Sequence, residues 1–352
     1  MRSALAFRQR LELRAAGLIT LLPPRLQVRL SGQPPIERDG QRLEPELQLM
    51  LSLIERRGRP PYGSLSLPEA REEMRRGAIV GARPAARLVA GVRDIEITGA
   101  AGPLPARHYA PIPTGRPQPL ILFFHGGGFV LGDLETHDVP CRLLAHHAGA
   151  HVVAVDYREA PEHRFPAAHE DALAAYRWAL ANAASIKGDP AKVALAGESA
   201  GGNLAVATAI AARDAKLQMP AAVVAVYPVA QSDTTTASYT TYAAAKPLDR
   251  PMIGWFLKNT LTDPAQAKDP RLSLTTAKLA GLPPVTIINA EIDPLRDDGA
   301  MLESALKAAN VSVERKLYDG VTHEFFGLGA VLDKARDANQ YAGDRLKQAF
   351  GR

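Results

Sequence analysis

A serine surrounded by small residues is the feature of this sequence with the clearest chemistry. Residues 197–202 read GESAGG and match the pattern G-x-S-x-G around Ser199. A strand is predicted at 192–196 and a helix from Ala200, which is the context of a nucleophile elbow that holds a serine hydroxyl above a sheet. A glycine-rich strand–helix turn with a capping serine is the purely structural alternative. The context favours Ser199 as a nucleophile, with the free N–H groups of the helix N-terminus facing developing negative charge.

A glycine-rich loop precedes this serine. Residues 125–129 read HGGGF and follow a predicted buried strand at 119–124. Acyl transfer needs N–H donors close to an oxyanion, and glycine lets the backbone approach; the other donor is the N–H after the nucleophile, here Ala200. A phosphate-binding loop is disfavoured because no Gly-Lys-Ser/Thr follows. We interpret His125 as a structural hydrogen-bonding residue rather than a base.

A nucleophilic serine needs a base, and the base needs an orienting carboxylate. One histidine follows Ser199 in the sequence, His323, between the last predicted strand and the last predicted helix. In proteins with a nucleophile elbow of this kind, the catalytic residues follow one another along the chain as serine, acid and histidine. Asp293 fits this order and lies just past the strand predicted at 285–290. Other carboxylates nearby are alternatives: Glu291, Asp297, Asp298 and Glu324. We favour Asp293, since the two later aspartates lie in a first helical turn where they complement the helix dipole.

The elements that would position these residues form a regular pattern from Val92 onward. Short apolar segments predict strands at 92–98, 106–110, 119–124, 151–157, 192–196, 222–227, 285–290 and 313–318. Helices are predicted at 136–148, 167–183, 200–212, 296–309 and 332–350. Continuous Val, Ile and Leu segments that alternate with helices indicate an α/β fold with a mostly parallel sheet covered on both faces.

Two regions do not follow this alternation. Residues 1–90 are rich in Arg and Pro, with helices predicted around 44–55 and from Ser66, where Pro68 and Glu69 suit a first turn. Residues 231–280 hold no clear strand, and a helix is predicted at 252–259. An insertion of this length is usually functional. We expect residues 1–90 and 231–275 to form a helical cap on a catalytic core made of residues 91–230 and 276–352.

Composition excludes several classes of protein. The 352 residues carry a net charge of +5, but the basic residues are mostly interleaved with acids and form no aromatic-rich basic run, which disfavours nucleic-acid binding. The single cysteine, Cys141, excludes an intrachain disulfide, and we expect it to be a buried helical residue. No apolar segment reaches the length of a membrane span. Charged residues near the N-terminus stand where the apolar part of a secretory signal would begin. We therefore expect a cytoplasmic protein.

Together these motifs resemble the hormone-sensitive-lipase-like family of bacterial esterases, bacterial family IV of the α/β-hydrolase fold. The resemblance rests on the two glycine-rich motifs, on DPL at 293–295, on HEF at 323–325 and on the segment DYREAPEHRFPAA at 156–168. It covers Val92 to the C-terminus well and the N-terminal region loosely. Two residues depart from the family pattern: Glu198, where Asp or Thr is commoner, and Glu159, where Leu is usual.

The resemblance implies an eight-stranded sheet with a helical cap and a cofactor-free, metal-free carboxylesterase. Its partner would be a small-molecule ester with a short to medium acyl chain, and a homodimer is compatible with the family. By motif position Ser199, Asp293 and His323 would form the catalytic triad. Gly127, Gly128 and Ala200 would form the oxyanion hole. Three alternatives stay open from the sequence: an amidase or peptidase with the same triad, a small-molecule receptor, and a membrane-surface protein that uses the basic N-terminal helix.

Overall fold

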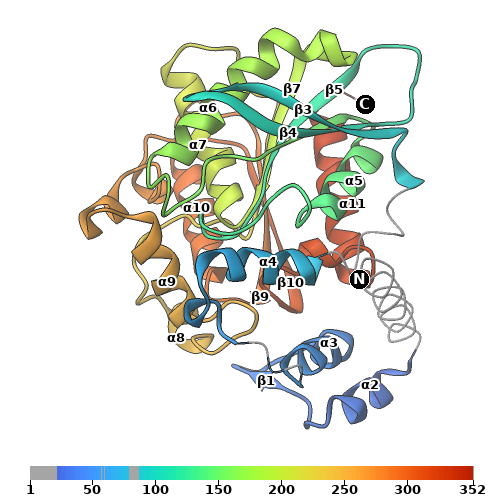
Figure 1. Cartoon of the computed structure of the whole chain (residues 1–352), viewed down its shortest axis with the longest axis vertical. Helices are drawn as coiled ribbons and strands as arrows, with labels where there is room; N and C mark the ends of the chain where they lie inside the picture. Colours follow the sequence, from blue (N-terminus) through green and yellow to red (C-terminus); the bar gives the residue numbers. More distant parts are fainter. Residues whose placement is uncertain (1–21, 57, 59, 79–86, 352) are drawn as a thin grey trace.

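The computed structural model describes residues 22–351 apart from residues 57, 59 and 79–86, so most of the basic N-terminal segment lies outside the described residues. Its centre is an eight-stranded sheet (Figure 1). The strands are β3 (Gly91–Gly99), β4 (Gly102–Ala110), β5 (Gln118–Phe124), β6 (His151–Val155), β7 (Gly188–Glu198), β8 (Val223–Val226), β9 (Val285–Ile292) and β10 (Val313–Thr322). Each overlaps a strand predicted from the sequence.

The strand order is β10-β9-β8-β7-β5-β6-β4-β3. The pairs from β6 to β10 are parallel, whereas β4 pairs antiparallel with both β6 and β3. Parallel neighbours require crossover connections, and helices supply them here. The predicted α/β-hydrolase sheet is therefore confirmed, with β4 as its antiparallel strand.

Ten α-helices are described along the chain. They are α2 (Pro24–Ser31), α3 (Pro45–Arg56), α4 (Leu67–Ala78), α5 (Asp138–Ala148), α6 (Ala167–Asn182), α7 (Ala200–Asp214), α8 (Ala237–Thr241), α9 (Arg250–Thr260), α10 (Arg296–Ala308) and α11 (Asp333–Ala349). Every helix predicted from Val92 onward is present. The sequence analysis did not predict α2 or α8.

The two faces of the sheet bury separate cores because successive side chains of a strand point to opposite faces. In β5, Leu120, Leu122 and Phe124 pack with residues of α6, α7 and α10, whereas Ile121 and Phe123 pack with residues of α5 and α11. Every residue of β5 is buried. The central strands are thus held rigidly from both sides, and the loops at their C-terminal ends start from fixed positions.

A third, smaller cluster joins the N-terminal region to the insertion after β8. Ala70 of α4 is buried with Val130 and Leu131, and Met252, Trp255 and Phe256 of α9 pack against the same cluster. The insertion holds α8 and α9 and no strand, as expected (Figure 1). This packing is what a helical cap requires, although the boundaries 1–90 and 231–275 remain a prediction.

The N-terminal elements follow the sequence pattern in part. The predicted helix around 44–55 is α3, and its Leu47 and Leu49 are buried. The predicted helix from Ser66 is α4, where the Glu69 carboxylate accepts hydrogen bonds from the Ser66 N–H and hydroxyl. Ahead of α3, β1 (Glu37–Arg38) and β2 (Gln41–Arg42) form a two-stranded hairpin that was not predicted.

Candidate active site

Ser199 lies in the sharp turn between β7 and α7. Its φ of 56° and ψ of −118° place it in a strained region of backbone space. Glycine is required on either side, because a Cβ at Gly197 would lie 2.2 Å from the Gly201 carbonyl oxygen and a Cβ at Gly201 would lie 1.9 Å from that of Phe124. The Ser199 N–H donates to the Val226 carbonyl at 2.9 Å, which ties the turn to β8. The turn therefore holds the hydroxyl at the C-terminal edge of the sheet.

The structure brings the three predicted residues of the triad together, although they come from three separate turns. Nε2 of His323 lies 2.9 Å from the Ser199 hydroxyl oxygen. Nδ1 of the same ring lies 2.7 Å from Oδ2 of Asp293. Asp293 is fully buried, and the exposed fractions of His323 and Ser199 are 4% and 8%. This is the geometry of a nucleophile, a base and an orienting carboxylate in line.

The charges around His323 favour its protonated form. Burial opposes a charged imidazolium, but the Asp293 carboxylate beside Nδ1 raises the pKa of His323 above its ordinary value. The other carboxylate oxygen of Asp293 accepts the Leu295 N–H at 2.8 Å, which fixes its orientation. The arrangement is suited to stabilise an imidazolium that forms during a reaction.

The loop predicted to supply oxyanion donors lies beside the serine. Gly127 has φ of 111° and Gly128 has φ of 63°, and both line the same cavity as Ser199 and His323. A Cβ on Gly127 would lie 1.8 Å from the Leu131 carbonyl oxygen, so the loop conformation requires glycine. Thr260 of α9 donates its hydroxyl hydrogen to the Gly128 carbonyl at 3.1 Å. Ala200, the third predicted donor, is buried at the start of α7.

The cavity over the serine has a volume of about 80 Å³ and a mostly apolar wall. The insertion after β8 contributes much of that wall through Leu248, Ile253, Phe256, Leu257 and Leu261. The sequence left open which of Phe129, Leu131, Tyr227, Trp255 and Phe325 line a pocket and which are core. Phe129 lines the cavity, whereas the others pack in the hydrophobic clusters.

The alternative carboxylates have other partners. Asp298 accepts hydrogen bonds from the backbone N–H groups of Ala230 and Gln231, Asp297 accepts from Ser238, and Glu291 accepts from Gly320. Glu324 lines the cavity with φ of 66° and has no hydrogen bond to His323 among the described residues. Of these carboxylates, Asp293 is the one hydrogen-bonded to His323.

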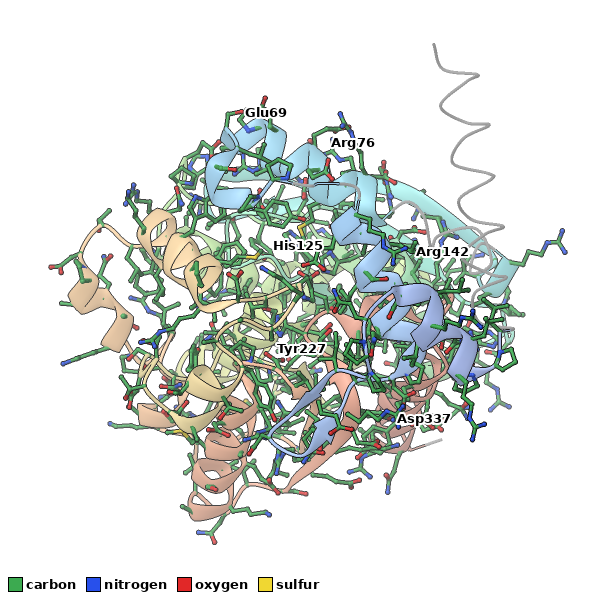
Figure 2. All side chains as sticks on the ribbon, turned by 90° about the horizontal axis from the view of Figure 1, so that it is seen from below. Glu69, Arg76, His125, Arg142, Tyr227 and Asp337 are labelled. Carbon is green, nitrogen blue, oxygen red and sulfur yellow. The ribbon has the colours of Figure 1, made fainter. Side chains whose placement is uncertain are left out.

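Two further sequence interpretations agree with the structure. His125 is buried in the interior (Figure 2), where its ring stacks on Tyr157 at 4.2 Å between ring centres and its Nδ1 lies 2.8 Å from the Gly126 carbonyl. It supports the loop and does not reach the serine's proton. Cys141 is buried in α5, and burial raises the pKa of its thiol well above the ordinary value, so it is held as a neutral thiol.

A residue that the sequence analysis missed holds the glycine-rich loop from outside. Arg71 of α4 donates from Nε to the Val130 carbonyl at 3.0 Å and from a terminal nitrogen to the Ala160 carbonyl at 3.1 Å. It also forms a bidentate pair with Glu162. These contacts join residues 59 to 91 positions apart, and no local pattern in the sequence indicates them.

Within the described ranges, no group of three or more His, Cys, Asp or Glu side chains is placed to hold a metal ion. The helices in those ranges likewise include none that is both long enough and apolar enough to cross a bilayer.

Comparison with known proteins agrees with this fold. The alpha/beta hydrolase fold family matches residues 121–327. The chain is 41% identical over 304 residues to the carboxylic ester hydrolase LipN of Mycobacterium tuberculosis, covering 82% of this chain and 78% of that protein. It is 34% identical to the ethyl acetate hydrolase of Pseudomonas putida, covering 87% and 99%. An esterase structure from Pyrobaculum calidifontis superimposes with a TM-score of 0.82 at 37% identity, covering 87% and 98%.

A mostly parallel sheet with a serine on a strand–helix turn defines a class of hydrolases, and these relatives lie within it. The chain belongs to the alpha/beta hydrolase fold family, in its hormone-sensitive-lipase-like branch.

Proposed function

We propose that this chain is a serine carboxylesterase that hydrolyses short- to medium-chain acyl esters through an acyl-enzyme intermediate. The observation that carries the proposal is the continuous line from the Ser199 hydroxyl to His323 at 2.9 Å and from His323 to Asp293 at 2.7 Å. Membership of the family and the names of the relatives, which are ester hydrolases, support the reaction class.

Acylation begins when the Ser199 oxygen attacks the ester carbonyl carbon while Nε2 of His323 takes the hydroxyl proton. The carbonyl π electrons move to its oxygen, and the N–H groups of Gly127, Gly128 and Ala200 stabilise the resulting oxyanion in our proposal. Asp293 keeps the Nδ1–H tautomer and stabilises the imidazolium. The intermediate collapses as the imidazolium gives its proton to the leaving alkoxide, so that alcohol and acyl-Ser199 form.

Deacylation repeats the same steps with water. His323 takes a proton from water as its oxygen attacks the acyl carbon, and the oxyanion forms at the same donors. Collapse of this second intermediate breaks the bond to Ser199, which recovers its proton from His323, and the carboxylic acid leaves. The serine, histidine and aspartate are unchanged at the end of the cycle.

The cavity supports the choice of substrate. Its wall is mostly apolar and lies directly over Ser199, which suits the acyl chain of an ester. We propose that α4, α8 and α9 act as a cap that closes this cavity, because α9 provides Phe256 to its wall and packs against the same cluster as α4.

A series of p-nitrophenyl esters from acetate to palmitate tests the proposal, with the p-nitroanilide of the best acyl group as a matched amide. We expect turnover of the short and medium esters, a steep decline before palmitate, and a much slower reaction with the anilide. No turnover of any ester by folded protein would contradict the proposed function, and faster cleavage of the anilide would replace it with an amidase.

A further inference from the structure

Glu198, the residue before the nucleophile, has a buried carboxyl group that the reaction described above does not use. Its exposed fraction is 3%. One oxygen, Oε2, accepts the hydroxyl hydrogen of Tyr227. The other, Oε1, lies 3.3 Å from Nε2 of His137 and makes no hydrogen bond within the described part of the chain. A buried oxygen of this kind needs an explanation, because leaving it without a partner is costly.

The hydrogen bonds of His137 show where its proton lies. Its Nδ1 is 2.7 Å from the Thr136 hydroxyl oxygen, and that hydroxyl donates its own hydrogen to the Asp133 carbonyl at 2.8 Å. This geometry allows the Thr136 oxygen to accept from Nδ1–H. At the opposite side of the ring, Nε2 accepts the Gly126 N–H at 3.1 Å. His137 is thus a neutral imidazole with a lone pair on Nε2.

A charged Glu198 carboxylate does not fit this arrangement. Its Oε1 would place negative charge against the lone pair of His137 Nε2, whereas a protonated Oε1 could donate a hydrogen bond to the same nitrogen. The titratable groups that face Glu198 come from several elements: His137 before α5, Cys141 in α5, Tyr227 after β8, and His323 and Glu324 after β10.

The effects of burial on the pKa values of Glu198 and His137 are consistent with a neutral Glu198 carboxyl group. Burial raises the pKa of Glu198 to about 7, against the lowering effect of the Tyr227 hydrogen bond. Burial also lowers the pKa of His137 to about 3, so that ring stays neutral over the working range.

We propose that Glu198 is a positioning residue that acts as a neutral carboxylic acid, sharing the single Nε2 lone pair of His137 with the Gly126 N–H in a three-centre hydrogen bond while accepting the Tyr227 hydroxyl hydrogen. In this state it joins the two halves of the site. His137 holds the Gly126 N–H at the start of the glycine-rich loop, and the Tyr227 ring lies 4.4 Å from the His323 ring between centres.

Loss of the Glu198 proton would weaken the site in two ways. The bridge to His137 would lose its donor, and a negative charge would lie one residue from the serine on which an oxyanion forms. Because His323 titrates in both proteins, turnover by the wild type should therefore fall relative to that of Glu198→Gln as pH rises through about 7. This consequence rests on the proposed esterase function, whereas the protonation of Glu198 can be measured without it.

The test compares Glu198→Gln with Glu198→Asp, and uses Glu96→Gln, an exposed acid on β3, as the matched control. Gln is neutral and of the same length, so we expect turnover within about threefold of the wild type below pH 7 and no decline as pH rises through 7 to 8. Asp is shorter by one methylene and cannot reach both partners, so we expect a loss of at least about tenfold at every pH. The control should keep the wild-type profile.

The Tyr227→Phe variant provides a second, independent test of the proposal. The Tyr227 hydrogen bond lowers the pKa of Glu198, so its removal should move the alkaline decline to higher pH. A decline that stays in place in Glu198→Gln, or a hundredfold loss in folded Glu198→Gln at all pH values, would overturn the proposal.

A thermal unfolding series separates this inference from the proposed function. The folded-state pKa of Glu198 is raised above the ordinary 4.5, so the neutral acid stabilises the folded protein at low pH. This stabilisation is lost as pH rises from about 4.5 through about 7. The Tm of the wild type should therefore fall relative to Glu198→Gln between pH 5 and 8. A constant Tm difference would overturn the inference even if the esterase activity is present.

Discussion

At the residue scale, the site depends on a buried pair whose charges compensate one another. His323 would be disfavoured as a cation by burial, and Asp293 reverses that preference through a 2.7 Å hydrogen bond. Neither neighbouring aspartate takes this role, because Asp297 and Asp298 accept backbone N–H groups of other segments. The geometry therefore supports Asp293 as the orienting carboxylate of the proposed triad.

Asp293→Asn should reduce turnover by about 10⁴-fold, because Asn can hold the imidazole in the wrong tautomer. The aspartate raises the pKa of His323, and the base must be neutral to act. The remaining activity of the variant should therefore decline on the acid side at a lower pH than the activity of the wild type does. Asp297→Asn is the matched control in a pH–rate series, and a larger loss in that control than in Asp293→Asn would show that the carboxylate is misassigned.

The sequence predicted the residues of the site better than their protonation. Ser199, His323 and Asp293 follow from motifs, from the order along the chain and from the fact that one histidine follows the serine. The sequence also marked Glu198 as unusual. It could not indicate the partners of Glu198, because Tyr227 is 29 positions away and the contact depends on the pairing of β7 with β8.

At the element scale, α4 acts on the glycine-rich loop through Arg71. Glu159 lies 3.1 Å from Nε of Arg71, but burial raises the pKa of Glu159 to about 9, so its carboxyl is neutral near pH 7. The Arg71 charge is balanced by Glu162, whose pKa is lowered by their hydrogen bond. The guanidinium thus links α4 to the Val130 and Ala160 carbonyls and to the segment after β6.

Arg71→Met should remove these hydrogen bonds and lower turnover by roughly tenfold, since the loop that carries Gly127 and Gly128 would lose its outer support. Arg76→Met on the same helix is the control, because Arg76 pairs with Glu72 and Glu73 of α4 itself at the outer surface (Figure 2). Ester turnover and Tm should be measured for both variants. An equal effect of the two substitutions would contradict a specific role for Arg71.

The elements of the core were predictable because their patterns are local. Buried parallel strands appear as continuous apolar segments, and the helices between them have helical spacing. The short helix α2 and the hairpin of β1 and β2 were missed, since their order depends on contacts made elsewhere in the chain. Gln48 of α3, for example, donates to the Ser31 hydroxyl and accepts the Ile36 N–H.

At the scale of the whole molecule, the packed sheet forms a rigid base. Buried acids make the stability of the fold depend on pH. Burial raises the pKa of Glu159 to about 9 and that of Glu198 to about 7, both above their ordinary values. Each stabilises the fold as a neutral acid, and that stabilisation is lost as pH rises through the folded-state value. The molecule should therefore become less stable as pH rises from about 5 to 9, and Glu159 accounts for the part between pH 7 and 9.

Glu159→Gln should flatten this decline, because Gln keeps the shape of the neutral acid and does not titrate. At 1.36 kcal/mol per pH unit, Glu159 accounts for about 3 kcal/mol of unfolding free energy between pH 7 and 9. Urea unfolding of the wild type and the variant at the two pH values gives the difference. Parallel slopes in the two proteins would show that Glu159 is already ionised at neutral pH.

The most direct test of the central claim is the turnover of p-nitrophenyl acetate by Ser199→Ala beside the wild type. The account predicts that the wild type turns over and that the variant, with the same Tm within a few degrees, loses activity by about 10⁶-fold. Equal turnover by the two proteins would contradict the assignment of Ser199 as the nucleophile and with it the acyl-enzyme mechanism.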